Sequence, residues 1–594
     1  MKHPKVIIVG GGLAGLMATI RVAETGVPVE LFSIVPVKRS HSVCAQGGIN
    51  AAKNQKGEGD TTWKHFDDTI YGGDFLANQP LVKRMCEEAP QIIDLLDRMG
   101  VTFNRTPEGL LDYRRFGGTL YHRTAFAGAT TGQQLLYALD EQVRRHESEG
   151  KVKKFEGCTF LSAVIDPSGV CRGICAMDLR SMEVKTFSAD AVILCTGGIG
   201  AIFGRSTNSV VCTGSAQSAL FQQGVDYANG EFIQVHPTSI PGEDKLRLMS
   251  ESARGEGGRV WVPKKLSDPR DPQTIPDSDR FYFLEEWYPK YGNLVPRDIA
   301  TRAIHRIVYQ EKLGINGQAA VFLDVSHIDR ATLDRKLEGI LEIYEKFCGV
   351  DPRVAPMKVF PGMHYTMGGL WVDNEDQATN VPGIYAAGEC EYQYHGANRL
   401  GANSLVSCIF GGGIAGPAAV KYARNLEKGA DSVSPAVFAA EQKRQEAKNQ
   451  ALLSNDGTEN PITIWKEMGE LMTEHVTVTR VNKQLEFAHN KLHELRDRFR
   501  RVNLSDRTQW SNQTLNFARE LENMLLLARV ITLGALARNE SRGAHYKPDF
   551  PDRDDANWLK TTRAKFCDNE IHLTYDPVDI SLIPPRVRKY DAAK

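Results

Sequence analysis

Three glycines close to the N-terminus have the spacing of a pyrophosphate-binding turn. Gly10, Gly12 and Gly15 form G-x-G-x-x-G within VIIVGGGLAGLMATIRVAETGVPVELF, between an apolar strand and a helix of small residues. Glycines allow the backbone to approach a pyrophosphate, and the N-terminus of the following helix favours its negative charge. Because the motif lies in a complete strand, helix and strand unit, it predicts a dinucleotide site rather than an ordinary tight turn.

Glu30 is predicted to select the kind of dinucleotide. It closes the second strand of this unit, at the separation expected of an acid that binds a ribose. An acid at this place favours free ribose hydroxyls over a 2′-phosphate. The residues therefore leave both FAD and NAD open and make NADP the weaker choice.

The next segment decides between FAD and NAD through a resemblance. KRSHSVCAQGGINAA (38–52) resembles the segment that carries covalently attached flavin in succinate dehydrogenases and fumarate reductases. The resemblance implies that His41 bonds the 8α carbon of FAD. Outside this context a histidine is more often a surface or core residue. The same resemblance assigns further contacts with the cofactor to Ser42, Gln46, Gly47 and Gly48.

A later segment, GECEYQYHGANRLGANSL (388–405), resembles the second flavin signature of the same family. By this resemblance Glu389 contacts ribityl or ribose hydroxyls. The resemblance also implies that Ser404 and Leu405 open a helix whose N-terminus points at the N1–C2=O edge of the flavin. The positive end of a helix dipole at that edge stabilises an anionic reduced flavin.

Further segments resemble the family and carry the residue types that dicarboxylate redox chemistry needs. They are VHPTS, LMSESARGEGG, VPRDIATRAI, HYTMGG and GANRLG, and they occur in family order along nearly the whole chain. Planar guanidinium groups bind carboxylates in a bidentate manner. The resemblance therefore implies that Arg399, His364, His236 and Thr238 clamp a four-carbon dicarboxylate.

Arg297 is the residue to which the resemblance assigns proton transfer. It follows Pro296, which is typical of a first helical position, so a cation is expected in the first helical turn, where the helix dipole disfavours it. By resemblance this arginine gives a proton to fumarate or takes one from succinate, while Arg254 and Glu251 relay it toward solvent.

Two other functions compete with this interpretation. L-aspartate oxidase shares the fold and much of the dicarboxylate site but binds FAD without a covalent bond, and His41 argues against it. A non-catalytic electron-transfer or assembly scaffold would not need the set Arg297, His364 and Arg399. One departure from the family is Asn229, where many relatives have an aspartate, and no role is assigned to it.

The strands and helices expected around these residues indicate an α/β fold. A second passage of strand and glycines (189–204) and a third (380–391) resemble later crossings of a doubly wound sheet, so the Rossmann-like FAD-binding domain is discontinuous. A proline-rich and then helical stretch interrupts it as a capping domain. Charged segments with helical spacing and an extended C-terminal segment follow. The predicted domains are 1–239 and 362–432 (FAD-binding), 240–361 (capping), 433–540 (helical) and 541–594 (C-terminal).

Composition limits the partners. Over 594 residues, Lys plus Arg (72) nearly cancels Asp plus Glu (73), so no global field favours nucleic acid. The uncharged stretch 400–420 is long enough to span a bilayer, but its glycines and Pro417 favour a buried helix. The eleven cysteines show no pattern typical of iron–sulfur ligands or of a metal site, so electrons are expected to leave through another polypeptide.

The resemblance names those partners. It implies an iron–sulfur subunit and a haem-containing membrane anchor, as in the bacterial branch whose anchor carries two haems, and peripheral attachment to the cytoplasmic face of the cell membrane. The segment around 540–555, SRGAHYKPDFPDRDD, is the expected interface with the iron–sulfur subunit. Whether the protein mainly oxidises succinate or reduces fumarate in the cell is left open, since one active site catalyses both directions.

Overall fold

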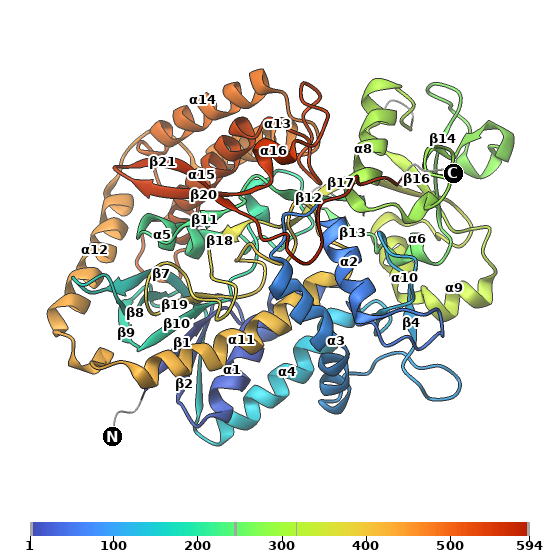
Figure 1. Ribbon diagram of the computed structural model, residues 1–594. Coiled ribbons are helices and arrows are strands. Elements are labelled where there is room, and N and C mark those ends of the chain that lie inside the picture. Colours follow the sequence, from blue (N-terminus) through green and yellow to red (C-terminus); the bar gives the residue numbers. More distant parts are fainter. Residues whose placement is uncertain (1–3, 241, 243–245, 316–317, 591–594) are drawn as a thin grey trace.

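The first apolar strand lies in the middle of a parallel five-stranded sheet of order β19-β10-β1-β2-β6 (Figure 1). This is a computed structural model that describes residues 4–240, 242, 246–315 and 318–590. Alternate residues of β1 enter different cores, because Val6 and Ile8 pack with helices whereas Ile7 and Val9 pack against a second sheet. A strand covered on both faces reads as a continuous apolar run. The strands are β1 (Val6–Val9), β2 (Val29–Ser33), β6 (Val152–Glu156), β10 (Ala191–Leu194) and β19 (Ile384–Ala386).

Helices cover one face of this sheet and an antiparallel sheet covers the other. On the helical face α1 packs along α11, and α4 packs against α1. The opposite face carries a three-stranded sheet of order β7-β8-β9. The elements are α1 (Leu13–Glu24), α2 (Thr62–Gly72), α3 (Gln79–Arg98), α4 (Thr131–Ser148), α11 (Asn403–Asn425), β7 (Cys158–Ile165), β8 (Cys171–Asp178) and β9 (Val184–Ser188).

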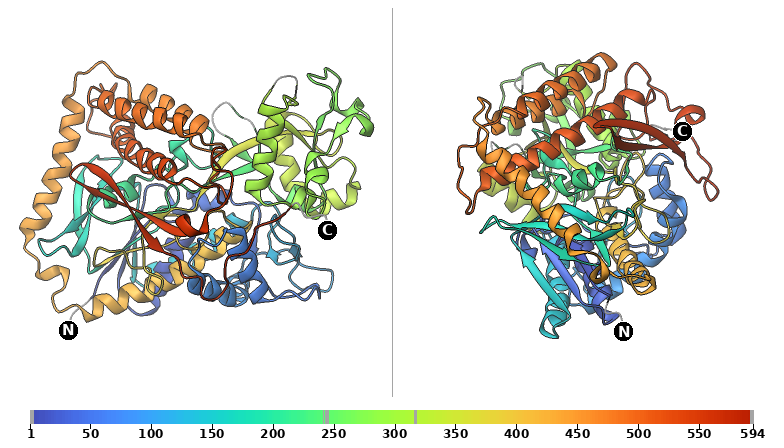
Figure 2. Two further views of the ribbon diagram at one scale, coloured as in Figure 1. Left: turned by 45° about the horizontal axis from the view of Figure 1, so that its top comes forward. Right: turned by 90° about the vertical axis from the view of Figure 1, so that its left-hand side faces the viewer.

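The two sheets and the helices that cover them form the body of the protein. A separate lobe, light green in Figures 1 and 2, stands beside this body and has a core of its own. The chain enters it through β12 (Ile233–Ile240) and leaves it through β17 (Met357–Thr366), which pair antiparallel. These strands belong to a six-stranded sheet of order β13-β12-β17-β16-β14-β15. Further elements of the lobe are β13 (Arg247–Leu248), β14 (Arg259–Pro263), β15 (Arg280–Phe281), β16 (Val321–Asp324), α6 (Ser252–Gly255), α7 (Phe283–Trp287), α8 (Arg297–His305), α9 (Arg330–Lys336) and α10 (Glu338–Cys348).

Four long helices follow, orange in Figure 1, as the charged segments of the sequence predict. Ser434, Asn460 and Asn512 cap α12, α13 and α15 by accepting a backbone N–H, and a proline begins α12 and α13. The helices are α12 (Pro435–Ser454), α13 (Pro461–His475), α14 (Asn482–Phe499) and α15 (Gln513–Ala537). The predicted fold class, an α/β fold with an interrupting lobe followed by helices, is confirmed.

The C-terminal segment is more regular than predicted. Strands β20 (Lys560–Cys567) and β21 (Glu570–Pro577) form a hairpin, and β20 also pairs with β11 (Tyr227–Ala228) in the body. Beyond the hairpin the chain runs over the body toward the light-green lobe, where Tyr590 packs against Tyr291 (Figure 1).

The prediction that the segment around 540–555 forms a subunit interface is wrong for its first part. Glu540, Arg542, His545 and Lys547 are at most 1% exposed. Arg538 and Arg542 both donate hydrogen bonds to Glu540, so these charges are paired within the chain. Buried paired charges cannot at the same time face a second polypeptide.

Candidate functional site

A cavity of about 530 Å³ lies at the carboxyl ends of the parallel strands and reaches to the light-green lobe. Val9, Ser33 and Cys195 line it from three neighbouring strands or the residues directly after them. Ligands of open α/β sheets bind at this edge. The cavity therefore lies where the glycine motif predicts a dinucleotide.

The glycine turn is built for close approach. A Cβ atom on Gly15 would lie 1.8 Å from the carbonyl oxygen of Gly10, and one on Gly10 would lie 2.1 Å from that of Cys195. Gly12 precedes α1 without a capping side chain. Gly10 and Gly12 line the cavity, whereas Gly15 lies beneath the turn and lets α1 pack against β1.

Glu30 is not where the sequence prediction puts it. It is the second residue of β2, not the last, and its carboxylate pairs with Lys5 Nζ at 3.0 Å outside the cavity. Strand β2 continues for three more residues, to Ser33, which does line the cavity. The carboxyl end of β2 therefore offers a hydroxyl group instead of an acid.

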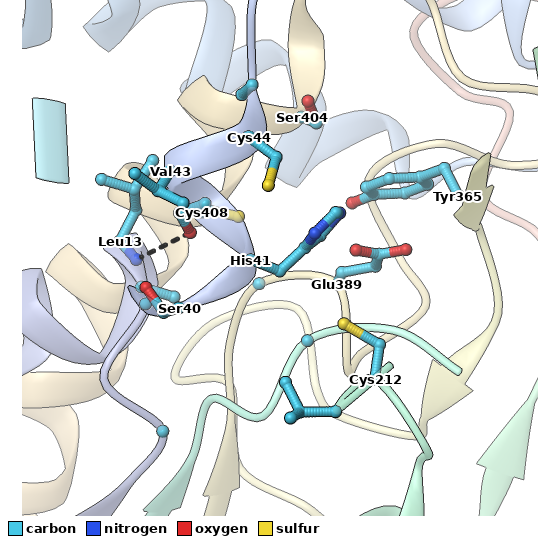
Figure 3. A pocket seen from close by; sticks show the side chains of 18 of the residues that line it. Leu13, Ser40, His41, Val43, Cys44, Cys212, Tyr365, Glu389, Ser404 and Cys408 are labelled. Atoms are coloured by element: carbon cyan, nitrogen blue, oxygen red, sulfur yellow. Dashed lines mark hydrogen bonds between the residues drawn. The ribbon is translucent and has the colours of Figure 1, made fainter. Parts of the chain in front are cut away.

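His41 lies in a short helix, His41–Cys44, and its ring points into the cavity beside Glu389 and Tyr365 (Figure 3). Ser209 donates its backbone N–H to Nδ1 at 3.2 Å, and the amide of Asn208 lies 3.0 Å from Nε2. The ring is thus held in one orientation by a loop from the body. Nearby, the Oγ of Ser42 accepts a hydrogen bond from the N–H of Leu13, at the start of α1.

The other predicted cofactor residues all line the cavity: Gln46, Gly47, Gly48, Glu389, Ser404 and Leu405. Burial raises the pKa of Glu389 to about 7, against hydrogen bonds from Thr366 that lower it. Helix α11 begins at Asn403 with no side-chain cap, directly after Ala402 at φ 63°. Its first backbone N–H groups are therefore not used by a capping side chain near the cavity.

Polar atoms in the cavity wall lack partners. Gln46 Oε1, Thr196 Oγ1 and Arg399 Nε are buried without a hydrogen bond, and all three residues line the cavity. Buried polar atoms in folded proteins are nearly always paired. Together with the glycine turn and the uncapped helix, they fit a bound dinucleotide with polar groups along its length.

At the lobe end of the cavity, Glu251 lies between two arginines. Its Oε2 accepts from Nε and Nη2 of Arg297 at 3.0 and 2.9 Å, and its Oε1 accepts from Nη2 of Arg254 at 2.7 Å. Burial alone would raise the pKa of Glu251, but Arg297 and Arg254 lower it below its ordinary value. Burial also lowers the pKa of Arg254. The three predicted proton-transfer residues thus form one continuous ion-paired chain.

Arg399 and His364 complete the wall of the cavity at this end. Burial, followed by the charge of Arg297, lowers the pKa of Arg399 to about 9, and its guanidinium stacks 4.5 Å from the ring centre of Tyr365. Burial and both arginines hold the pKa of His364 well below its usual range, so this imidazole is neutral. Thr207 contacts its Nδ1 at 2.7 Å. Arg297, Glu251, His364 and Arg399 all line the cavity.

His236 and Thr238 lie behind this wall. Neither residue lines the cavity, and the ring of His236 packs edge-on against that of His364, with 5.1 Å between ring centres. Nδ1 of His236 faces Thr238, and its Nε2 is buried without a partner. The structure brings both residues close to the predicted site but gives neither a direct contact with the cavity.

Gln234 is a site residue that the sequence interpretation missed. Its Oε1 accepts from Nη1 of Arg297 at 3.0 Å, and its Nε2 donates to the backbone oxygen of Arg399 at 2.7 Å. It therefore links the two arginines. The signal was present, since Gln234 and His236 are two residues apart on β12 and share one face of the strand.

The arrangement suits a small dianion. Arg254, Arg297 and Arg399 face one carboxylate, Glu251, so the buried cluster carries a net positive charge. Bidentate guanidinium groups match carboxylates. Among the described residues, no group of three or more His, Cys, Asp and Glu side chains could hold a metal ion.

Comparisons with known proteins agree with this geometry. The family model described as "FAD binding domain" matches residues 5–405, and that described as "Fumarate reductase flavoprotein C-term" matches residues 465–590. The chain is 63% identical to the succinate dehydrogenase flavoprotein subunit of Bacillus subtilis over 596 residues, covering 100% of both chains. It is 34% identical to the fumarate reductase flavoprotein subunit of Escherichia coli, covering 98% of this chain and 95% of that one.

Solved structures give the same result. The quinol fumarate reductase flavoprotein of E. coli superposes with a TM-score of 0.90 at 32% identity, over 100% of this chain and 99% of that one. A structure described as quinol-fumarate reductase with menaquinol molecules gives 0.89 at 32% identity, over 99% and 100%.

Proposed function

This chain belongs to the family of succinate dehydrogenase and fumarate reductase flavoprotein subunits, and we propose that it interconverts succinate and fumarate in the cavity described above. It is an FAD-binding oxidoreductase, and L-aspartate oxidase is not favoured by the relatives it matches. The observation that carries the substrate proposal is the chain Arg297–Glu251–Arg254, which opens at one end onto the same cavity as the glycine turn.

The residues of the cavity divide into two groups by role. The glycine turn, Ser33, Glu389 and the start of α11 would hold FAD. Bound FAD supplies the hydride acceptor and donor. Arg399 and His364 would hold the two carboxylates of the substrate, while His236 and Thr238 support His364 from behind. Gln234 keeps Arg297 and Arg399 at a fixed separation.

In this proposal Arg297 transfers the proton. A terminal guanidinium nitrogen of Arg297 gives a proton to the substrate carbon in one direction and takes it back in the other. Glu251 accepts hydrogen bonds from Nε and Nη2 of Arg297 and is therefore placed to restore the proton. Arg254 is hydrogen-bonded to the other oxygen of Glu251, and its lowered pKa makes it a better proton donor than a solvated arginine.

The remaining assignments extend this proposal. His41, which points into the cavity, would carry FAD covalently. The relatives are subunits of larger enzymes, so electrons would pass to an iron–sulfur subunit and a haem-containing membrane anchor at the cytoplasmic face of the membrane. Residues 240–361 would form the capping domain between the FAD-binding parts 1–239 and 362–432, with 433–540 and 541–594 as helical and C-terminal domains.

Dye-linked turnover tests the function directly. The purified protein should reduce an artificial dye with succinate and oxidise a reduced dye with fumarate. Arg297→Ala should lower kcat by at least about 10²-fold while dicarboxylate binding persists, because a positioned proton carrier contributes about 10² to 10⁴ in rate. The matched control is Arg306→Ala, which removes a half-exposed ion pair just beyond the same helix. If Arg297→Ala kept more than about a tenth of the wild-type rate, another residue would carry the proton.

A further inference from the structure

The C-terminal tail reaches the site through Asp298, the residue directly after Arg297. Asp298 is the second residue of α8 and its side chain is 1% exposed. Arg588 donates to both of its oxygens, from Nη1 to Oδ2 at 2.5 Å and from Nη2 to Oδ1 at 3.0 Å. The side chain of Arg588 is itself only 7% exposed. This is a bidentate, buried ion pair between residues 290 positions apart.

A chain of hydrogen bonds continues from Asp298 to both substrate arginines. Asn398, which precedes Arg399, donates from Nδ2 to Oδ1 of Asp298 at 3.1 Å. Its own Oδ1 accepts from Gln234 at 2.9 Å, and Gln234 in turn accepts from Arg297. Asp298 is thus joined to Arg297 by the peptide bond on one side and by two amide side chains on the other.

The tail is seated by specific contacts rather than lying loosely on the surface. Gln79 exchanges hydrogen bonds with the backbone of Ile583, at 2.8 Å to both its N–H and its oxygen. The ring of Tyr590 packs between Tyr71 of α2 and Tyr291 of the lobe, at 5.5 and 5.2 Å between ring centres. These contacts fix the tail against the body and the lobe at once, so Arg588 has a defined position.

From this geometry we infer that Arg588 is a positioning residue for proton transfer: it holds Asp298, and through Asp298 it sets the place of Arg297 relative to Arg399. The inference rests on the proposed function, because that function gives Arg297 its role. Stability alone is a weak reason for such a pair, since buried ion pairs are often no better than apolar contacts. Reaction geometry is a stronger one, because a displacement of about 1 Å can cost about 10²-fold in rate.

Burial alone would raise the pKa of Asp298, but Arg588 and then Arg302 lower it, so the carboxylate stays charged. Arg302, four residues along α8, approaches Asp298 only at 3.5 Å and cannot replace the two short bonds of Arg588. Without Arg588, the buried carboxylate of Asp298 would be held mainly by Asn398. A shift of Asp298 would then displace Asn398 and the neighbouring Arg399.

The test separates turnover from binding, using the protein purified with its partner subunits. The wild-type protein is first assayed for succinate oxidation with a dye, and this assay tests the proposed function independently of any variant. Arg588→Ala should then lower kcat at least about 10-fold, equal to about 1.4 kcal/mol of barrier. The dissociation constant for a non-reacting dicarboxylate, followed by the flavin absorbance change, should move less than about 3-fold, and the flavin content should stay the same.

Arg586→Ala is the matched control, because Arg586 lies in the same tail as Arg588 but its half-exposed side chain pairs with Asp67 of α2. It should keep the wild-type kcat. Arg588→Lys should recover part of the lost kcat, since a single ammonium replaces the fork. If Arg588→Ala did not fold, Asp298→Asn, which breaks the same pair at nearly constant volume, would take its place with the same expected split.

Three outcomes would overturn the inference. In the first, Arg588→Ala, or its substitute, keeps more than half of the wild-type kcat. In the second, the dicarboxylate dissociation constant weakens in parallel with kcat, which would make the tail a general support of the pocket. In the third, Arg586→Ala loses as much kcat as Arg588→Ala.

Discussion

Arg297 is the first residue of α8, where the helix dipole opposes a positive charge, and the carboxylate of Glu251 compensates for it. Glu251 accepts hydrogen bonds from Nε and Nη2 of Arg297, whereas the next residue, Asp298, pairs with Arg588. The unfavourable position therefore does not leave the cation unpaired. The contact with Glu251 holds the guanidinium of Arg297 between the lobe and the cavity. The proposed proton donor to a bound dicarboxylate has to lie there.

His41 yields a prediction at the scale of one residue. His41→Ser should leave FAD bound but extractable after denaturation, because in the proposed site the glycine turn and α11 would still hold it. The resemblance implies that this covalent bond raises the flavin potential, so succinate oxidation should fall more than fumarate reduction. Ultraviolet fluorescence of the denatured band measures the bond, with the exposed His327→Ser as a control. An unchanged signal in His41→Ser would rule out attachment at this residue.

Glu391 yields a prediction on pH. Burial raises its pKa from 4.5 to about 8, against one backbone hydrogen bond from Gln393. A raised pKa means that the folded state keeps a proton that the unfolded state has lost. The stabilisation is complete below about pH 4.5 and is lost as the pH rises to about 8, by at most about 1.4 kcal/mol per pH unit.

Glu391→Gln should therefore flatten the fall in unfolding midpoint between pH 5 and pH 8. The exposed Glu375→Gln should leave the profile unchanged. Thermal unfolding of each variant at several pH values measures this. A Glu391→Gln profile parallel to that of the wild type would mean that this carboxyl is not protonated in the folded state.

Among the elements, α11 shows how a long, largely apolar helix can belong to the core of a protein. It is long and apolar enough to cross a membrane, with a mean hydropathy of 1.3 over its most apolar window, yet 78% of that window is buried inside the protein. Its glycines let it lie directly against α1. A Cβ on Gly412 would come within 2.2 Å of the carbonyl oxygen of Ala14, whereas one on Gly413 would meet nothing within 4 Å.

These neighbouring glycines form a matched pair of tests. Gly412→Ala should destabilise the protein by about 1–3 kcal/mol, because the added methyl group separates two packed helices. It should also weaken FAD retention, since both helices begin at the cavity. Gly413→Ala should be neutral or stabilising by about 0.5–1 kcal/mol, as a helical glycine with free space. Unfolding midpoints and flavin content of the two variants measure these effects. Equal effects of the two substitutions would contradict the packing argument.

At the scale of the molecule, the site exists only where the parallel sheet meets the lobe. The glycine turn, His41 and Glu389 come from the body, while Glu251 and Arg297 come from the lobe. Strands β12 and β17 join the two and bring Gln234 and His364 to the junction. Any change in how the lobe sits on the body would therefore act on catalysis before it acts on FAD binding.

The whole chain yields a prediction about electron flow. The isolated chain should pass electrons from succinate to a small dye but not to a membrane quinone, because its relatives work as one subunit of a quinone-linked enzyme. Parallel assays with the dye and with a quinone analogue measure this. Quinone reduction at the rate of dye reduction, with no partner present, would favour a self-sufficient enzyme. Adding the iron–sulfur and anchor subunits should restore quinone reduction.

The fold class could be predicted from the sequence alone, and so could most of the residues that line the cavity at the glycine turn. Motifs such as G-x-G-x-x-G and the segments around His41 and Glu389 are local, because a few adjacent residues shape a turn or a helix start whatever surrounds them. The glycine-rich helix was also recognisable, since its glycines and proline are poorly suited to a simple membrane span. These features depend on backbone geometry over short stretches, which a linear pattern records directly.

Which of the candidate residues meet in space depends on the packing of distant elements and could not be predicted from the sequence. The prediction for Glu30 is wrong because the end of β2 is set by the pairing of β2 with β1 and β6, and not by the number of residues after the glycine turn. His236 and Thr238 fall behind His364 because β12 and β17 pair with irregular register next to them. Gln234, and the link from Arg588 to Asp298, join residues far apart in the chain. Such contacts depend on how the lobe, the body and the tail pack together. The spacing of Gln234 and His236 indicates a shared strand face, but it does not indicate which arginines Gln234 contacts.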